Sequence, residues 1–471
     1  MNLNNINSAY FLGIGGIGMS AIARYLKSRG IDVSGYDKTP SELTDALQQE
    51  GIHITFEDSK ETLPAGILAA PDSVLLVYTP AIPSDHIQLN YLQAKGHTLY
   101  KRSEVLGMIS RDAYCIAVAG THGKTTTSTL IAHLLYESNI NFTAFLGGIS
   151  ANYGTNYINH TQGRDLFPDK PVVVLEADEF DRSFHRLSPD IAIITAIDPD
   201  HLDIYENEDA FREAFRIFAG KIKTGGRLIY HHTLTEKWPA DIFCVAYGTH
   251  VDTIPSVSCE NIQPVGDVFH FDLKMDDGNT RSVTTDWQSG LPGFHNVENA
   301  TAALAACISL PGLSEDALRK GVSSYRGAKR RFEYVIKTPE YIVIDDYAHH
   351  PQELNAIIGS VKALYPDREI TGIFQPHLFT RTRDFADGFA ESLDKLDVPI
   401  LLDIYPAREL PIPGITSDWL LGKMKNPAKK RMENHEAVQF VKTTKPALLL
   451  ILGAGDIDRL VPVIKDIYHG I

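Results

Sequence analysis

The segment that most restricts the fold of this chain is AGTHGKTTT, at Ala119–Thr127. It follows an apolar run typical of a buried strand and opens a helical pattern, STLIAHLLY. A glycine turn between a strand and a helix directs backbone N–H groups at an anion, and the lysine and threonine that follow it suit phosphates and Mg²⁺. Only two residues separate Gly120 from Gly123, and an ordinary glycine turn is the alternative. The Gly-Lys-Thr triplet in this context favours a phosphate-binding loop in an α/β fold.

A second glycine-rich turn lies in FLGIGGIGMS, at Phe11–Ser20. Gly13, Gly15 and Gly18 have the spacing of dinucleotide-binding turns, and Asp37 follows nineteen residues after the last of them. A nicotinamide-dependent dehydrogenase is therefore one interpretation. It would leave the stronger phosphate-binding loop without a function.

Composition excludes several other classes of protein. The 471 residues suffice for two to four domains, and the net charge of −15 argues against a nucleic-acid-binding surface. Four scattered cysteines without a CxxC pair indicate a reducing compartment rather than disulfides or a zinc site. No stretch reaches the roughly 18 apolar residues of a membrane span, and the opening lacks the basic start of a signal peptide. We therefore expect a cytoplasmic protein without membrane insertion.

Short apolar runs alternate with amphipathic helical stretches along the whole chain, which predicts α/β layering with mostly parallel sheets. Three blocks are expected, at residues 1–109, 110–329 and 330–471. Within the second block, Val251–Asp286 has the alternating pattern of an antiparallel insertion.

Polar clusters follow directly after the predicted strands. Such clusters begin at Glu176, Asp198, Asp345 and Gln375. Ligands of open α/β sheets bind outside the carboxyl ends of the strands, so these clusters are placed where a site would be. Mg²⁺ prefers oxygen ligands and usually takes one or two carboxylates, which makes Glu176 the leading partner for the Thr125 hydroxyl.

His201 is a possible additional metal ligand. Solvated strand ends and a structural histidine are the alternatives for these two positions.

Two further groups of side chains suit anions or a base. His295 and Asn296 lie at a predicted helix entry, where an N-cap role for the asparagine is the alternative, and Asn299 shares its helical face. In an acidic protein, arginines among apolar neighbours indicate anion binding, because the guanidinium fork matches carboxylate and phosphate. These arginines are Arg331, Arg381 and Arg383, and a solvated basic face is the alternative for them.

With these residues identified, the chain closely resembles the Mur ligases, ATP-dependent amide-forming enzymes of peptidoglycan synthesis. The resemblance covers essentially the whole chain. Its marks, in order, are GIGGIGMS, AGTHGKTTT, EADEFDRSF, PDHLD, GFHNVENATAA, GAKRRFE, DDYAHHP, FQPHLFTRTRD and LGAGDI.

The resemblance implies a Rossmann-like N-terminal domain for a UDP-sugar, a central P-loop ATPase-like domain for ATP, and a Rossmann-like C-terminal domain that closes over the site with the amino acid. It implies that ATP phosphorylates the lactyl carboxylate of UDP-N-acetylmuramate and that the amine of L-alanine attacks the acyl phosphate. We expect a monomer or a weak homodimer.

The resemblance also assigns residues. Those for ATP are Gly120, Thr121, Gly123, Lys124, Thr125, Thr126, His295, Asn296, Asn299, Arg331 and Asp346. Those for the UDP-sugar are Gly13, Gly15, Gly16, Ile17, Gly18, Met19, Ser20, Asp37, Thr79 and His122. Those for Mg²⁺ are Thr125, Glu176 and His201, and those for the amino acid are His349, Arg381 and Arg383. The catalytic set is Lys124, Glu176, His201 and His349, with His349 as the candidate base for the alanine ammonium.

Two departures from relatives bear on the substrate. Ala348 stands where alanine-adding members usually have glycine, and EDAFREAFRIF lacks the lysine of members that add glutamate or diaminopimelate. The second departure favours alanine. A ligase that joins the same UDP-sugar to a preformed tripeptide in cell-wall recycling is the nearest alternative.

Overall fold

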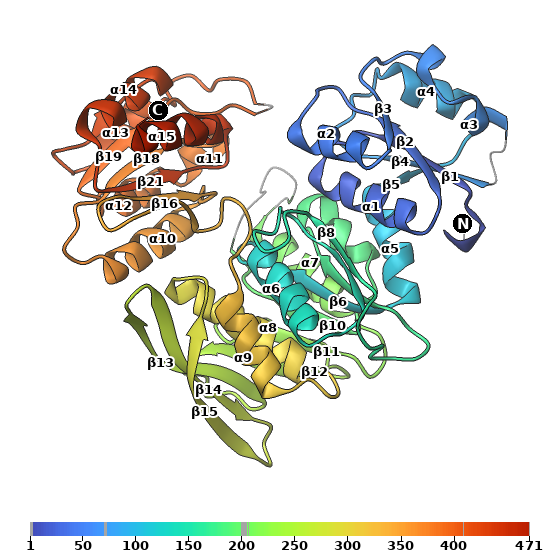
Figure 1. The fold of residues 1–471 in the computed structure, drawn as a ribbon, viewed down its shortest axis with the longest axis horizontal. Coiled ribbons are helices and arrows are strands. Elements are labelled where there is room, and N and C mark those ends of the chain that lie inside the picture. The colour runs from blue at the N-terminus through green and yellow to red at the C-terminus, as the bar shows by residue number, and fades with distance from the viewer. Residues whose placement is uncertain (1–2, 70–72, 199–204, 206, 408, 471) are drawn as a thin grey trace. The chain divides into compact units, whose positions relative to one another are not determined.

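The computed structural model describes residues 3–69, 73–198, 205, 207–407 and 409–470. It contains three sheets along the chain (Figure 1). The first has the order β3-β2-β1-β4-β5, and all neighbouring strands in it are parallel. Its strands are β1 (Ser8–Leu12), β2 (Asp32–Tyr36), β3 (His53–Thr55), β4 (Val74–Tyr78) and β5 (Leu99–Lys101). Its helices are α1 (Ile17–Ser28), α2 (Glu42–Gln49), α3 (Ala65–Ala69), α4 (Ile87–Ala94) and α5 (Arg102–Asp112).

The second sheet has ten strands in the order β15-β14-β13-β12-β11-β10-β6-β9-β7-β8. Its first strands are β6 (Tyr114–Ala119), β7 (Phe142–Phe145), β8 (Tyr157–His160), β9 (Val172–Glu176) and β10 (Ile191–Ile194). The others are β11 (Arg227–His231), β12 (Phe243–Thr249), β13 (Ser256–Val265), β14 (Val268–Asp276) and β15 (Arg281–Ser289). The associated helices are α6 (Lys124–Glu137), the 3₁₀ helix η4 (Phe180–Arg186), α7 (Glu208–Ala219), α8 (Phe294–Ile308) and α9 (Glu315–Ser324).

The predicted antiparallel insertion corresponds to β13, β14 and β15. These strands are neighbours in the sheet and are joined by connections of two and four residues. Parallel neighbours need a crossover of about a dozen residues or more, so the three strands form antiparallel hairpins. The alternation of polar and apolar residues identified this feature because one face of an antiparallel sheet can remain in water.

The third sheet has the order β16-β17-β21-β18-β19-β20, in which β16 and β17 are antiparallel and the other neighbouring strands are parallel. Its strands are β16 (Glu333–Lys337), β17 (Ile342–Asp346), β18 (Thr371–Phe374), β19 (Val398–Leu401), β20 (Lys430–Arg431) and β21 (Leu448–Leu452). Its helices are α10 (Pro351–Leu364), α11 (Phe379–Asp384), α12 (Ala386–Leu393), α13 (Ser417–Lys423), α14 (Asn434–Thr444) and α15 (Leu460–His469). The central strands β17 and β21 are fully buried, as expected for a parallel sheet covered on both faces.

The chain divides into two compact units. The first comprises Met1–Glu260, Leu273–Thr285 and Glu298–Tyr325, and the second comprises Asn261–Asp272, Asp286–Val297 and Arg326–Ile471. One hydrophobic cluster in the first unit contains both Val77 of β4 and Ala117 of β6, so the first two sheets share a core. The predicted domain boundaries after residues 109 and 329 remain predictions, and α5 runs across the first of them to Asp112.

No helix in the described part of the chain has the length and hydrophobicity needed to cross a membrane. The four cysteines are free thiols.

Candidate functional site

The loop between β6 and α6 requires glycine at two positions. Gly120 has φ +132°, and a Cβ there would lie 2.1 Å from the Thr195 hydroxyl oxygen. Gly123 has φ +78°, and a Cβ there would lie 2.4 Å from Oδ1 of Asn299. Both conformations are ones that side chains disfavour, and both approaches are too close for a methyl group. The tight loop therefore depends on contacts from Thr195, directly after β10, and from α8 as well as on its own glycines.

Further hydrogen bonds fix the loop and the start of α6. The N–H of Thr121 donates to the carbonyl of Ala196, and the Tyr325 hydroxyl donates to the carbonyl of Thr126 at 3.0 Å. Asn299, assigned to ATP from the sequence, accepts from the Thr127 hydroxyl at 3.4 Å. The structure therefore brings Asn299 to the loop, whereas Thr125 and Thr126 are buried at its helical end.

The Lys124 ammonium is held by two acceptors. Its Nζ donates to the carbonyl of Gly120 at 2.5 Å and to Oε1 of Glu179 at 2.8 Å. Burial alone lowers the pKa of Lys124, but Glu179, Glu176 and Asp178 outweigh burial, so the pKa is raised and the amine stays charged. Three carboxylates of one short segment thus favour the charged form of the lysine, and Glu179 is the one that contacts it.

The sequence pattern did not identify Glu179 as the carboxylate that contacts Lys124. Its side chain is 3% exposed, and its Oε2 has no hydrogen-bond partner among the described residues. Its backbone is fixed because the Tyr205 hydroxyl donates to its carbonyl at 2.6 Å. Its place in the acidic LEADEFD segment was a signal, but the segment offers four carboxylates and does not show which one faces Lys124.

Glu176 ends β9 and lies flat against Gly147. The N–H of Gly147 donates to its Oε2 at 3.1 Å, and a Cβ on Gly147 would lie 2.2 Å from both carboxylate oxygens. Like Glu179, Gly147 is a residue of the site that the sequence pattern did not identify. His201, the third residue assigned to Mg²⁺, lies outside the described residues.

His122 was assigned to the UDP-sugar but lies within the phosphate-binding loop itself. Its Nε2 is 3.6 Å from Oδ2 of Asp198, the first residue of the second polar cluster. The Thr195 hydroxyl donates to the carbonyl of His122.

The first glycine turn is also built by close approaches. Gly13 has φ +85°, and a Cβ there would lie 2.6 Å from the Thr79 methyl group, so these two residues assigned to the UDP-sugar are in contact. Gly16 is the N-cap of α1. The N–H of Gly15 donates to Oδ2 of Asp37 at 2.7 Å. Asp37 therefore contacts the glycine turn directly and occupies one of its N–H groups.

Among the other residues assigned to the UDP-sugar, Met19 and Ser20 are buried in the first turns of α1. The Ser20 hydroxyl donates to the carbonyl of Ile17 at 3.0 Å and accepts from the Asn156 amide at 2.9 Å. Asn156 precedes β8, so the second sheet supports the start of α1.

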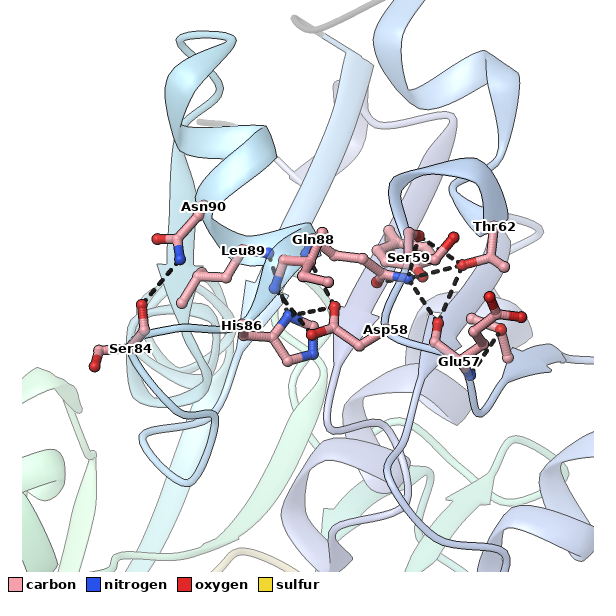
Figure 2. A network of polar contacts seen from close by, with 12 residues as sticks. Glu57, Asp58, Ser59, Thr62, Ser84, His86, Gln88, Leu89 and Asn90 are labelled. Atoms are coloured by element: carbon pink, nitrogen blue, oxygen red, sulfur yellow. Dashed lines mark hydrogen bonds and ion pairs between the residues drawn. The ribbon is translucent and has the colours of Figure 1, made fainter.

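A polar network joins the segment after β3 to the start of α4 (Figure 2). Asp58 accepts from the N–H groups of Ile87 and Gln88, at 2.9 and 3.0 Å, and so caps α4. His86, 4% exposed, packs edge-on against Tyr36 with ring centroids 4.6 Å apart, and burial lowers its pKa. His86 Nδ1 also lies 3.2 Å from Oδ1 of Asp58, so this histidine belongs to the network that holds the start of α4.

The second unit contains the residues of the DDYAHHP segment. Asp346 accepts from the N–H groups of Phe332 and Ala348, and burial raises its pKa to about 6. The guanidinium of Arg331 lies 5.0 Å from the centroid of the Tyr347 ring, in cation–π geometry. Arg331 and Asp346 therefore lie at the same strand end.

Glu353 of α10 joins two residues that the sequence assigned to different substrates. Its Oε2 is 3.3 Å from Nδ1 of His349, and its Oε1 is 3.8 Å from Nη1 of Arg331. His349 also contacts the carbonyl of Tyr347 through Nδ1 at 2.9 Å.

The two arginines of α11 lie in different surroundings. Arg381 is buried, and its Nη1 donates to Nδ1 of His377 at 3.4 Å. Arg383 is exposed and pairs with Asp384 at 2.7 Å. The structure does not bring their guanidinium groups to one point, because residues two apart on a helix do not face each other.

His295 and Asn296 also belong to the second unit. The Asn296 amide donates to the carbonyl of Pro292 at 2.6 Å, and His295 Nδ1 is 3.5 Å from the Ser360 hydroxyl. The helix α8 begins at Phe294, so the alternative of Asn296 as its N-cap is wrong. Asn296 lies inside the first turn and satisfies a backbone carbonyl outside it.

Two glycine turns at the carboxyl ends of parallel strands, one of them followed by a partly buried lysine, define a multidomain nucleotide-binding α/β protein. The chain belongs to the Mur ligase family. Family models described as "Mur ligase family, catalytic domain", "Mur ligase middle domain" and "Mur ligase, glutamate ligase domain" match residues 8–114, 118–307 and 330–456.

Relatives are similar along their whole length. A UDP-N-acetylmuramate–L-alanine ligase of Flavobacterium johnsoniae is 45% identical over 100% of this chain and 99% of its own. Another, of Porphyromonas gingivalis, is 46% identical over 97% of this chain and 98% of its own. The crystal structure of a UDP-N-acetylmuramate-alanine ligase from Thermotoga maritima matches with a TM-score of 0.79 and 27% identity, covering 98% and 99% of the two chains. The three-domain α/β fold expected from the sequence is thereby confirmed.

Proposed function

We propose that this chain is an ATP-dependent ligase that forms an amide between the lactyl carboxylate of UDP-N-acetylmuramate and L-alanine. The observation that carries the proposal is the 45% identity over the full chain to a ligase named for this reaction. The phosphate-binding loop and its buried lysine supply the chemistry that such a ligase needs. This addition is the first amino-acid step in making a peptidoglycan precursor.

The reaction has two steps. The lactyl carboxylate attacks the γ-phosphorus of ATP, which releases ADP and leaves an acyl phosphate. The amine of L-alanine then adds to the acyl carbon, loses a proton, and expels inorganic phosphate. Phosphoryl transfer depends mainly on positioning and charge stabilisation, and the Lys124 ammonium fits that role because the loop fixes it in place.

Mg²⁺ fits the residues beside this loop. The Thr125 hydroxyl and the Glu176 carboxylate are hard oxygen donors, and the orphaned Glu179 Oε2 shows that the carboxylate cluster has unused acceptor capacity. No group of three or more His, Cys, Asp or Glu side chains capable of holding a metal occurs in the described parts of the chain. Mg²⁺ needs no such cage, since it commonly takes one or two protein oxygens together with phosphate and water. When bound, it would neutralise charge on the transferring phosphoryl group.

The amino-acid site is proposed in the second unit. Buried Arg381 suits the carboxylate of L-alanine, and a fixed carboxylate presents the amine to the acyl phosphate, which is a proximity effect. His349 is proposed as the group that takes the ammonium proton, and Glu353 beside it would stabilise the resulting imidazolium. Arg383, His295 and Asn296 keep their sequence assignments as proposals.

We place the reaction in the cytoplasm, where ATP and nucleotide sugars are available and where the four free thiols stay reduced. A monomer or a weak homodimer is proposed as the active species, which sedimentation velocity can check.

The decisive experiment supplies ATP, Mg²⁺ and UDP-N-acetylmuramate and measures phosphate release after addition of L-alanine, glycine, L-serine or the murein tripeptide. We expect release with L-alanine above the other three. Absence of alanine-dependent release would refute the proposal, and preference for the tripeptide would assign the chain to cell-wall recycling.

A further inference from the structure

The guanidinium of Arg102 lies against the first turn of α1. A Cβ built on Gly18 would lie 2.2 Å from Nη1 of Arg102 and 3.0 Å from its Cδ. Arg102 begins α5 immediately after β5, at the carboxyl edge of the first sheet. Gly18 therefore lacks a side chain where this cation needs room.

The glycine turn itself cannot offer all its N–H groups to an anion. The N–H of Gly15 is taken by the Asp37 carboxylate, and that of Gly16 contacts the carbonyl of Gly13 at 3.3 Å. Asp37 also places a negative charge on the turn. An anionic ligand is thus directed away from Gly15 and toward Ile17 and Gly18 at the positive end of α1, since the N–H groups of Met19 and Ser20 already donate to the Gly16 carbonyl.

Arg102 has capacity for such a ligand. A guanidinium carries five N–H donors, and the one hydrogen bond that Arg102 makes to a described side chain runs from Nη2 to Oδ2 of Asp178, at 3.0 Å. The Arg102 side chain is 26% exposed. Asp178 accepts a hydrogen bond from Nη2 on one side of the Arg102 guanidinium, and Nη1 on the other side faces Gly18.

We propose that Arg102 binds the diphosphate of the nucleotide sugar at Gly18, and that Asp178 is a positioning residue that holds its guanidinium there. This inference rests on the proposed function and adds a residue that the glycine motif does not contain. It also gives the nucleotide-sugar site a direct contact with the segment that carries Glu176 and Glu179, because Asp178 lies between them.

The test compares the binding of UDP and of uridine by calorimetric or NMR titration. Arg102→Met should weaken UDP binding ten- to a hundredfold, since a charge-assisted phosphate contact is lost, and should leave uridine binding unchanged. Gly18→Ala should weaken UDP binding similarly, because the added methyl group displaces the flexible end of Arg102 while alanine favours the helix. Arg111→Met, on the exposed end of the same helix, is the matched control and should bind both ligands normally.

Double variants test whether Asp178 acts through Arg102. Asp178→Ala should weaken UDP binding severalfold in the wild-type background and have no further effect in Arg102→Met, which a merely structural role would not produce. If Arg102→Met binds UDP as tightly as the wild type does, the inference is overturned while the proposed function stands. If the wild-type protein binds UDP no better than uridine, the assignment of the first glycine turn to a nucleotide sugar fails as well.

Discussion

Replacing Gly147 with alanine tests whether Glu176 takes part in the reaction. The glycine lies against the Glu176 carboxylate, and an alanine Cβ would be 2.2 Å from both of its oxygens. Ordinary van der Waals contact begins near 3.4 Å, so the carboxylate must move by about 1.2 Å. The carboxylate is the free end of a flexible side chain, so it can move without disrupting the strand.

Displacement of a reacting or charge-stabilising group by about 1 Å can cost about a hundredfold in rate. Gly147→Ala should therefore reduce the rate of alanine-dependent phosphate release by about 10²-fold, equivalent to about 2.7 kcal/mol of activation free energy. The thermal midpoint and the circular dichroism spectrum should stay close to those of the wild type.

The assay measures kcat with all three substrates and Mg²⁺ saturating, with ADP binding as a second readout of the phosphate loop. Gly422→Ala is the control, since Gly422 is exposed on α13 and a Cβ there meets nothing within 4 Å. A folded Gly147→Ala protein with kcat within about twofold of the wild type would refute the role of Glu176.

Four other outcomes are expected. Lys124→Ala should abolish phosphate release while circular dichroism shows an intact fold, and near-normal turnover would mean that the phosphate site is misplaced. Glu179→Ala removes the buried carboxylate that contacts the partly buried Lys124 ammonium, which costs about 3 kcal/mol and should lower the calorimetric midpoint of the first unit by several degrees. An unchanged midpoint would contradict this ion pair. Burial raises the pKa of Asp345 to about 7, compared with about 3.9 for an aspartate in the unfolded chain. The folded state therefore binds this proton more tightly than the unfolded state does. The second unit should lose stability as pH rises from about 4 to 7. Asp345→Asn should remove that part of the pH dependence, as judged from melting points at pH 5 and pH 7. Removal of Mg²⁺ with EDTA should stop phosphate release and excess Mg²⁺ should restore it, whereas activity in EDTA would exclude the proposed metal.

Much of the fold was predictable because its signals are local. The alternation of apolar runs with helical stretches predicted the parallel sheets. The period-two pattern of Val251–Asp286 predicted the antiparallel insertion, which the β13–β15 hairpins form. The N-cap alternative for Asn296 failed because the helix begins two residues earlier, at Phe294, and the asparagine amide donates to the Pro292 carbonyl instead. The opening glycines indicated a diphosphate but could not show that Asp37 occupies the N–H of Gly15.

The sequence by itself determined the two glycine turns, the lysine and threonine of the phosphate loop, and membership of a family whose motifs occur in order. These features are read from neighbouring residues, and strand–turn–helix geometry follows from them directly. Only the tertiary structure decided which distant groups meet: Glu179 with Lys124 across 55 positions, and Arg102 with Asp178 across 76. Such contacts depend on how parallel strands align at one edge of a sheet, and no local pattern of residue types encodes which of several carboxylates will face a given cation there.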